Sequence, residues 1–214
     1  YSSDKGPQIL NASITGRTLT QQKLFAIAPL LDLIGSVESD GYDDIENRID
    51  ESTLNGRKLT QMTVQEVLDW QKTLPGDTAS GRYQFIRSTL EYTLQKSSVV
   101  SGSDLFTPET QDILALEIMQ IQGNLDGFLG KEITREEFGN KLATIWSALP
   151  KVSGTGAGKS AYRGIGKNEE KTDVGNVLLN LDIVQERWSR VLEEQSKSFS
   201  STFPISRPSI FNNI

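Results

Sequence analysis

The stretch LDLIGSVESDGY, residues 31–42, indicates a helix that has an apolar face and ends at an acidic residue. At about 100° per residue, Leu31, Ile34 and Glu38 fall on one side of such a helix. The Asp-Gly pair that follows favours a turn, so we expect the helix to end near Glu38. A carboxyl group there is desolvated on one side and open to a cleft on the other. Partial desolvation raises a carboxyl pKa, which suits a general acid. A surface glutamate at a frayed helix end is the alternative interpretation.

The composition of the 214-residue chain restricts the chemistry that it can perform. Cysteine and histidine are both absent, which excludes thiol nucleophiles, Ser-His-Asp catalysis and the usual zinc sites. Acid–base work therefore falls to Asp, Glu, Lys or Tyr. The net charge of −6 argues against general nucleic-acid binding. No apolar run approaches the ~20 residues of a membrane span. We expect no metal, no cofactor, no nucleic-acid partner and no membrane span.

Start and stop signals for helices recur along the chain and predict a mostly helical protein. Pro29 suits the first turn of a helix over residues 30–39, and a short helical piece over 24–28 is expected before it. Capping boxes that begin at Thr63 and Thr134 start two further helices. Most of the regular structure is therefore expected to be α-helix.

The polar segment 41–60 contains Asn55-Gly56, a pair that favours a two-residue β-hairpin. We therefore expect a small β-wing here, and an α+β fold that is mostly helical. The segment is also acidic, but its carboxylates lack the spacing of a calcium-binding hand. A solvated face is the simpler interpretation of these acids.

The last expected helix has apolar residues spaced four, three, four and three apart. These are Val177, Leu181, Val184, Trp188 and Val191. Docking of this helix on the domain is favoured over a coiled coil, because the pattern is shorter than three or four heptads. We expect an N-terminal arm over 1–20, a central domain over 21–170, and a C-terminal helix with an extended tail over 171–214. Because the chain begins with Tyr1 rather than Met, a processed product or a fragment is expected.

The loop over residues 153–160 nearly matches a phosphate-binding P-loop. That motif requires Gly or Ala where this chain has Ser153, and it follows a strand, whereas this loop follows an expected helix. Nucleotide binding is therefore disfavoured. The loop is interpreted either as a flexible segment that carries Lys159 or as part of a substrate cleft.

The string Gly81-Arg82-Tyr83-Gln84 combines properties that suit the binding of a sugar. Glycine lets the backbone approach a ligand closely, tyrosine offers a stacking face, and glutamine offers both a donor and an acceptor. Trp146, at the end of an expected core helix, is interpreted either as a further sugar contact or as a core residue.

Together these strings resemble the phage lambda endolysin and related lysozyme-like domains of phage tail and other virion proteins. The resemblance rests on the order of Glu38-Ser39, the string 81–84, the helix start at 106–112, and the string 145–150 followed by a Gly-rich loop. The Glu-Ser and Gly-x-x-Gln pair is also similar to that of lytic transglycosylases more widely. The resemblance covers about residues 25–165.

The resemblance implies a lysozyme-like fold with a cleft between two lobes. It also implies cleavage of the β-1,4 bond between N-acetylmuramic acid and N-acetylglucosamine in peptidoglycan glycan strands. Glu38 takes the place of the catalytic residue. The resemblance implies that Tyr83 and Gln84 contact the substrate. Ser39, Tyr42, Arg82 and Trp146 are predicted as further substrate contacts.

Two reaction branches stay open. In the transglycosylase branch, the muramoyl C6 hydroxyl attacks the anomeric carbon and Glu38 is the only carboxylate needed. In the hydrolase branch, water attacks with the help of a second acid. The candidates for that acid are Asp43, Asp44 and Glu46.

The acidic net charge and the two arms favour a domain carried by a phage particle, in its tail or injected. Such a domain would act on the cell wall in the bacterial periplasm. Other virion proteins are the expected partners of the arms and the last helix. The alternative is a catalytically inactive structural or assembly module of a phage particle.

Overall fold

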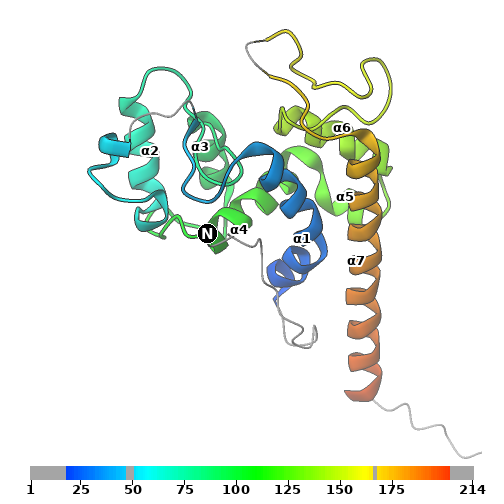
Figure 1. The fold of residues 1–214 in the computed structure, drawn as a ribbon. Coiled ribbons are helices and arrows are strands. Elements are labelled where there is room, and N and C mark those ends of the chain that lie inside the picture. Colours follow the sequence, from blue (N-terminus) through cyan, green and yellow to red (C-terminus); the bar gives the residue numbers. More distant parts are fainter. Residues whose placement is uncertain (1–17, 47–50, 166–167, 203–214) are drawn as a thin grey trace, which may run out of the picture.

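The regular structure of the protein is almost entirely helical (Figure 1). The structure is a computed structural model that describes residues 18–46, 51–165 and 168–202. Its α-helices are α1 (Leu19–Glu38), α2 (Val64–Thr73), α3 (Arg87–Lys96), α4 (Pro108–Ile118), α5 (Leu125–Leu129), α6 (Arg135–Ile145) and α7 (Val174–Thr202). Shorter turns of helix are η3 (Glu51–Leu54), η4 (Leu59–Gln61) and the π-helical η5 (Met119–Gly123). The prediction of a mostly helical class is confirmed.

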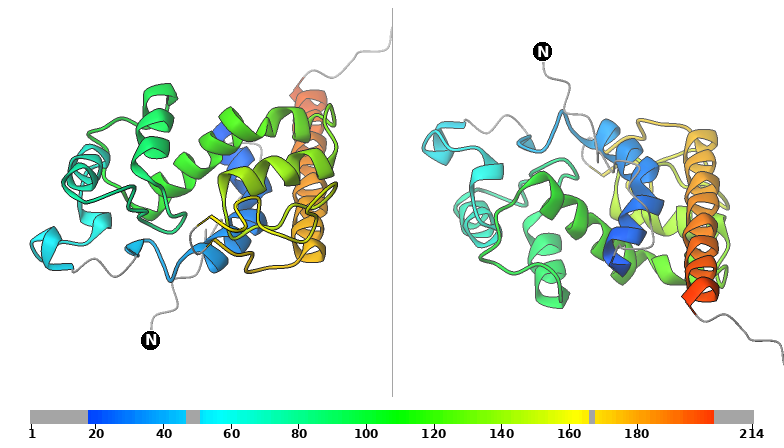
Figure 2. Two further views of the ribbon diagram at one scale, coloured as in Figure 1. Left: turned by 90° about the horizontal axis from the view of Figure 1, so that it is seen from above. Right: turned by 90° about the horizontal axis from the view of Figure 1, so that it is seen from below.

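The helices gather into two lobes joined by α4 (Figures 1 and 2). One lobe contains α2 and α3, which pack against each other. The other contains α1, α5, α6 and α7, with α7 lying along α1 and α6. Because α4 contacts both α1 and α3, it fixes the two lobes relative to each other.

The first helix, α1, is longer than predicted from the sequence. It begins after Thr18, whose side chain and that of Gln21 form a reciprocal capping box, and it runs without a break to Glu38. The prediction that Pro29 occupies the first turn of a separate helix was wrong, because Pro29 lies inside α1. Burial of the apolar side chains on both sides of the proline outweighs the lost backbone donor. The predicted end of the helix at Glu38 is confirmed.

The segment around Asn55-Gly56 forms a turn, but the described residues do not form the hairpin strands of the expected β-wing. Asn55 and Gly56 have φ of +52° and +75°, and the N–H of Arg57 donates to the carbonyl of Leu54. The turn is flanked by η3 and η4 rather than by strands. Across residues 18–46, 51–165 and 168–202, β-pairing is limited to isolated antiparallel bridges. The flanking segments anchor single leucines in the core and lack the alternation that a paired strand needs.

Helix α7 docks on the protein through the apolar stripe seen in its sequence. Val177, Leu181, Val184 and Val191 are fully buried. Gln195 Nε2 also donates a hydrogen bond of 2.8 Å to Gln22 Oε1 on α1. The prediction that this helix docks on the domain is therefore confirmed.

The expected N-terminal arm and C-terminal tail lie largely outside the described residues. Of the helices that are described, none is both long and apolar enough to cross a membrane.

Candidate functional site

Glu38 ends α1 at the edge of a cavity of about 690 Å³ that both lobes line. Its lining includes residues between 79 and 89, residues 144–148, and residues 168, 169 and 171. The backbone N–H of Ala148 donates a hydrogen bond of 3.1 Å to Glu38 Oε1. No described residue donates a hydrogen bond to Oε2, so that oxygen is available to a group that enters the cavity.

Burial raises the pKa of the Glu38 carboxyl above its ordinary value. The Ala148 hydrogen bond and the positive charge of Lys171 lower this pKa in part, while the negative charge of Glu46 raises it. The net shift is upward, so a larger fraction of the carboxyl is protonated than in an exposed glutamate at the same pH. The protonated carboxyl is the form that acts as a general acid.

A tight turn over residues 80–85 brings Gln84 to the cavity wall. Ser80 and Phe85 exchange backbone hydrogen bonds of 3.2 and 2.9 Å, and both Gly81 and Gln84 have positive φ, of +78° and +46°. Gln84 Nε2 donates to the carbonyl of Gly81 at 2.9 Å, while no described residue donates to its amide oxygen. The half-buried Gln84 side chain therefore offers an acceptor to a ligand.

The buried side chain of Gln111, on α4, holds this turn in place. Its Oε1 accepts a hydrogen bond of 2.9 Å from the backbone N–H of Arg82. Its Nε2 donates to the carbonyls of Tyr42 and Phe106, each at 2.9 Å. Three segments that are distant in sequence are thus joined by one side chain.

Tyr83 and Tyr42 are buried and share the carboxylate of Asp112. Both hydroxyls donate to Asp112 Oδ1, at 2.6 Å from Tyr83 and 3.0 Å from Tyr42. Tyr83 is only 1% exposed, although it contributes to the cavity wall, and Tyr42 does not line the cavity. These positions fit support of the cavity floor better than direct contact with a ligand.

Asp112 gives the folded protein a dependence on pH. Burial raises the pKa of Asp112 to about 6, from 3.8 for an ordinary aspartate. The folded state therefore binds the proton more tightly, so the contribution of Asp112 to stability is greatest below the unfolded pKa and is lost as pH rises to about 6. In Asp112→Asn, the amide oxygen can still accept both tyrosine hydroxyls. The midpoint of urea unfolding is expected to fall less in this variant than in the parent between about pH 4 and about pH 6. If the urea midpoint changed equally with pH in the two proteins, Asp112 would not be the group whose raised pKa causes this dependence.

The other predicted contacts are placed differently from one another. Trp146, which caps α6, lines the cavity and donates from Nε1 to the carbonyl of Tyr83 at 3.0 Å. Ser39 donates from Oγ to the carbonyl of Arg82 at 2.8 Å. The buried Arg82 side chain packs against α1 and pairs with Asp32 at 3.3 Å. Neither Ser39 nor Arg82 lines the cavity. They attach the end of α1 to the turn that carries Gln84.

Of the three candidates for a second acid, Glu46 alone lines the cavity. Its Oε2 accepts a hydrogen bond of 3.2 Å from the N–H of Ala79. Asp43 accepts from the N–H of Thr60 at 2.8 Å. Asp44 accepts from the backbone N–H groups of residues 40 and 45, at 3.2 and 3.0 Å. The geometry therefore separates one acid at the cavity from two that stabilise the neighbouring backbone.

Tyr162 and Lys171 also line the cavity, and neither was predicted from the sequence as a site residue. The Tyr162 side chain is 36% exposed, and its hydroxyl donates to the carbonyl of Thr144 at 2.5 Å. The only signal near them was the interpretation of the preceding loop, residues 153–160, as part of a cleft. Lys159, the lysine of the near P-loop, instead pairs with Glu170 at 2.9 Å.

In the described part of the chain, no group of three or more acidic side chains comes close enough together to hold a metal ion. Glu38, Gln84 and Trp146 line one cavity, which suits a polar organic ligand because it offers a carboxyl proton donor and an amide acceptor.

Two comparisons with known proteins bear on this site. The family described as Endolysin matches residues 57–171, which is just over half of the chain. The match includes the turn with Gln84, Trp146, Ala148 and Lys171, and it begins after Glu38. No curated protein matches the chain. The chain therefore belongs to the endolysin family, the phage enzymes that degrade the bacterial cell wall.

Proposed function

We propose that this endolysin cleaves the β-1,4 bond between N-acetylmuramic acid and N-acetylglucosamine, and that its two lobes form a lysozyme-like fold. The observation that carries the proposal is the position of Glu38, half-buried at the cavity and hydrogen-bonded to the N–H of Ala148. A glycosidase needs a protonated carboxyl beside the leaving oxygen, within a groove that accepts a polysaccharide. The cavity of about 690 Å³ has the size of a site for a small part of a glycan strand.

In the proposed reaction, the Glu38 carboxyl donates its proton to the glycosidic oxygen while the sugar ring passes through an oxocarbenium-like state. Gln84 offers its amide oxygen to a sugar hydroxyl or amide N–H, and the wall formed by Trp146 and Tyr83 shapes the space for the ring. The other three predicted contacts are not expected to touch the substrate, and they help to position the backbone of the site. Ser39, Tyr42 and Arg82 position α1 and the turn over 80–85.

The step that follows proton donation distinguishes two candidate activities. In a transglycosylase, the muramoyl C6 hydroxyl attacks the anomeric carbon and the Glu38 carboxylate accepts its proton. In a hydrolase, a second carboxylate assists the attack of water, and the place of Glu46 in the cavity wall favours this candidate. Mass spectrometry of digested peptidoglycan separates them, because 1,6-anhydro ends mark the transglycosylase and reducing ends mark the hydrolase.

Tyr162 is expected to contribute a stacking face for a sugar ring. It is an exposed aromatic residue at the cavity, and its hydroxyl is already bound to the carbonyl of Thr144. Removing such a contact costs about 1 kcal/mol, so Tyr162→Ala is expected to raise KM for soluble glycan strands about fivefold, with kcat nearly unchanged. Tyr92→Ala is the matched control, because Tyr92 is 42% exposed on α3 and does not line the cavity. Equal KM values in the two variants would remove Tyr162 from the site.

The proposal also retains delivery by the phage particle and the division of the chain predicted from its sequence. Residues 21–170 would form the muralytic part, with α7 bracing α1 and the remaining tail available to virion proteins. Peptides of this chain in purified virions would support that location. Loss of turbidity by chloroform-treated Gram-negative cells tests for an active enzyme, and absence of lysis would favour the inactive assembly module.

A further inference from the structure

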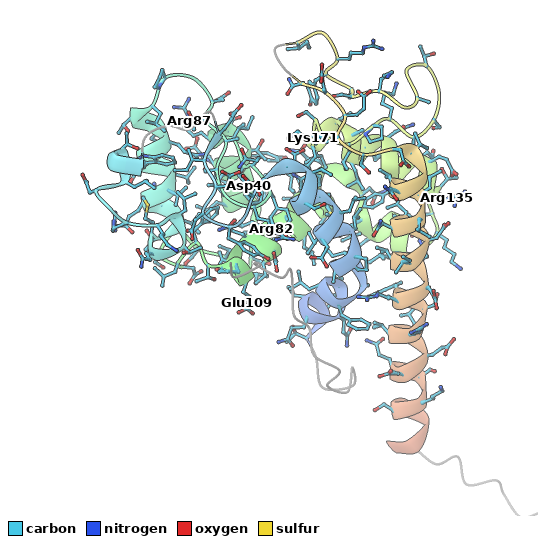
Figure 3. The ribbon with its side chains drawn as sticks, viewed as in Figure 1. Asp40, Arg82, Arg87, Glu109, Arg135 and Lys171 are labelled. Carbon is cyan, nitrogen blue, oxygen red and sulfur yellow. The ribbon has the colours of Figure 1, made fainter. Side chains whose placement is uncertain are left out.

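Lys171 lines the cavity and is linked to Glu38 through the backbone of Ala148. Its N–H donates a hydrogen bond of 2.9 Å to the carbonyl of Ala148, and the N–H of Ala148 donates to Glu38 Oε1. The position of Lys171 relative to Glu38 is therefore fixed by two successive hydrogen bonds. In Figure 3, Lys171 is labelled near the loop that precedes α7, and Arg82 lies closer to α1 and α4.

The charges around the cavity are unbalanced. Three of its lining residues are acids, Glu38, Glu46 and Glu169, and Lys171 is the one cation among the lining residues that the structure describes. The Lys171 side chain is exposed, and no described acidic group lies within ion-pair distance of it. Its charge nevertheless reaches Glu38, since it lowers the pKa of that carboxyl. Lys171 thus lines the same cavity as Glu38, and its ammonium group is available to an anion.

The proposed substrate is itself an anion. Each muramoyl unit carries a lactyl arm, which ends either in a free carboxylate or in a stem peptide with its own carboxylates. An acid-lined cavity repels such groups unless a cation receives them. The charges of the cavity therefore do not restrict where a neutral glycan backbone binds. A carboxylate of the substrate, in contrast, is repelled by the three acids and is expected to bind at Lys171.

We propose that Lys171 binds a carboxylate on the lactyl arm of muramic acid and so sets the register of the glycan strand against Glu38. The inference rests on the proposed function and specifies its substrate: anionic, muramoyl-containing strands are preferred over neutral ones. Lys171 acts here as a specificity-determining contact and takes no part in proton transfer.

The experiment uses three strands of one length. The first bears stem peptides, the second is stripped by an amidase and ends in free lactyl carboxylates, and the third is the stripped strand with those carboxylates converted to neutral amides. Binding is measured by calorimetry in the Glu38→Gln background, so that no strand is consumed. Cleavage is measured separately in chains that retain Glu38. Loss of binding and loss of catalysis can then be distinguished.

On the strand whose carboxylate pairs with Lys171, the Lys171→Gln variant is expected to bind about fivefold more weakly than the parent. Lys171→Glu is expected to bind about tenfold more weakly, or more weakly still. Lys171→Arg should stay within about twofold of the parent, since it keeps the charge. On the neutral strand all three variants should bind as the parent does. Lys197→Gln, at an exposed position on α7 away from the cavity, is the control for a lost lysine charge.

An effect on the peptide-bearing strand identifies the stem peptide as the source of the carboxylate, and an effect on the stripped strand identifies the lactyl group. An equal effect on carboxylated and neutral strands, or none on any strand, overturns the proposal. If the parent binds with the expected preference but cleaves nothing, the proposed function fails while the role of Lys171 stands. A shift of the pH–rate profile alone, without a change in strand preference, also overturns it, because Lys171 would then act only on the pKa of Glu38.

Discussion

Glu38→Gln is expected to lower the rate of cell-wall cleavage about 10³-fold while leaving the fold intact. The amide keeps the shape of the side chain and an oxygen that can accept the hydrogen bond that the Ala148 N–H now donates to Glu38 Oε1 at 3.1 Å. It has no proton of the required acidity to give to the leaving oxygen. Because the carboxyl is half-buried with a raised pKa, its replacement by a neutral group is not expected to destabilise the protein.

The measurement is the rate at which purified peptidoglycan is solubilised, with thermal unfolding as the check on folding. Glu193→Gln is the matched control, because Glu193 is exposed on α7 and does not line the cavity. Glu193→Gln changes the net charge by the same amount as Glu38→Gln and should retain the parental rate. Solubilisation by Glu38→Gln at the parental rate would show that another group supplies the proton.

Gly81→Ala is expected to destabilise the protein by about 3 kcal/mol. Gly81 has φ of +78°, a conformation that costs an alanine about 1–2 kcal/mol. A Cβ there would also lie 2.4 Å from Gln111 Oε1 and 2.9 Å from Phe106 Cε1, and relief of such overpacking costs about 1–3 kcal/mol. Gln111 cannot move freely, because its amide bonds three backbone groups.

The free energy of unfolding in urea measures this effect, and Gly76→Ala provides the control. Gly76 has nearly the same φ, +77°, but a Cβ there would meet no atom within 4 Å. It should show the backbone cost alone, about 1–2 kcal/mol. The difference between the two variants reports the contact with Gln111. Equal losses would mean that Gln111 yields without cost, and that the turn over 80–85 is less firmly held than its hydrogen bonds indicate.

Distortion of the turn over 80–85 would also affect catalysis. Gln84 faces the cavity only because the turn closes between Ser80 and Phe85. Gly81→Ala is therefore expected to lower kcat/KM even at temperatures where the chain remains folded, because a small displacement of a substrate contact is costly in catalysis.

The errors of the sequence analysis have a common cause. A proline and an Asn-Gly pair are local signals, and each behaved locally as expected: Pro29 kept a helical backbone, and Asn55 and Gly56 adopted positive φ. What they join was decided by burial. The apolar residues before Pro29 share one core with those after it, so one helix is more stable than two. Leu54 and Leu59 each fill the core from a short helical turn.

Among the predicted site residues, the sequence identified residue types but not which atoms face outward. The sequence predicted that Tyr83 offers a stacking face to a ligand. In the structure its hydroxyl donates to Asp112 on α4, and the side chain is buried. Arg82 is similarly drawn to Asp32 on α1. These partners lie 29 and 50 residues away in the chain, so no local pattern reveals them.

The sequence by itself determined that α1 ends at Glu38 and that the carboxyl stands at the end of an apolar face, because helix periodicity and the following Asp-Gly are local properties. The absence of cysteine and histidine likewise limited the candidate proton donors. Only the tertiary structure decided what surrounds that carboxyl. Ala148, Gln84, Tyr162 and Lys171 reach the cavity from three segments more than 40 residues from Glu38, and they do so because burial of the two lobes against α4 brings these segments together.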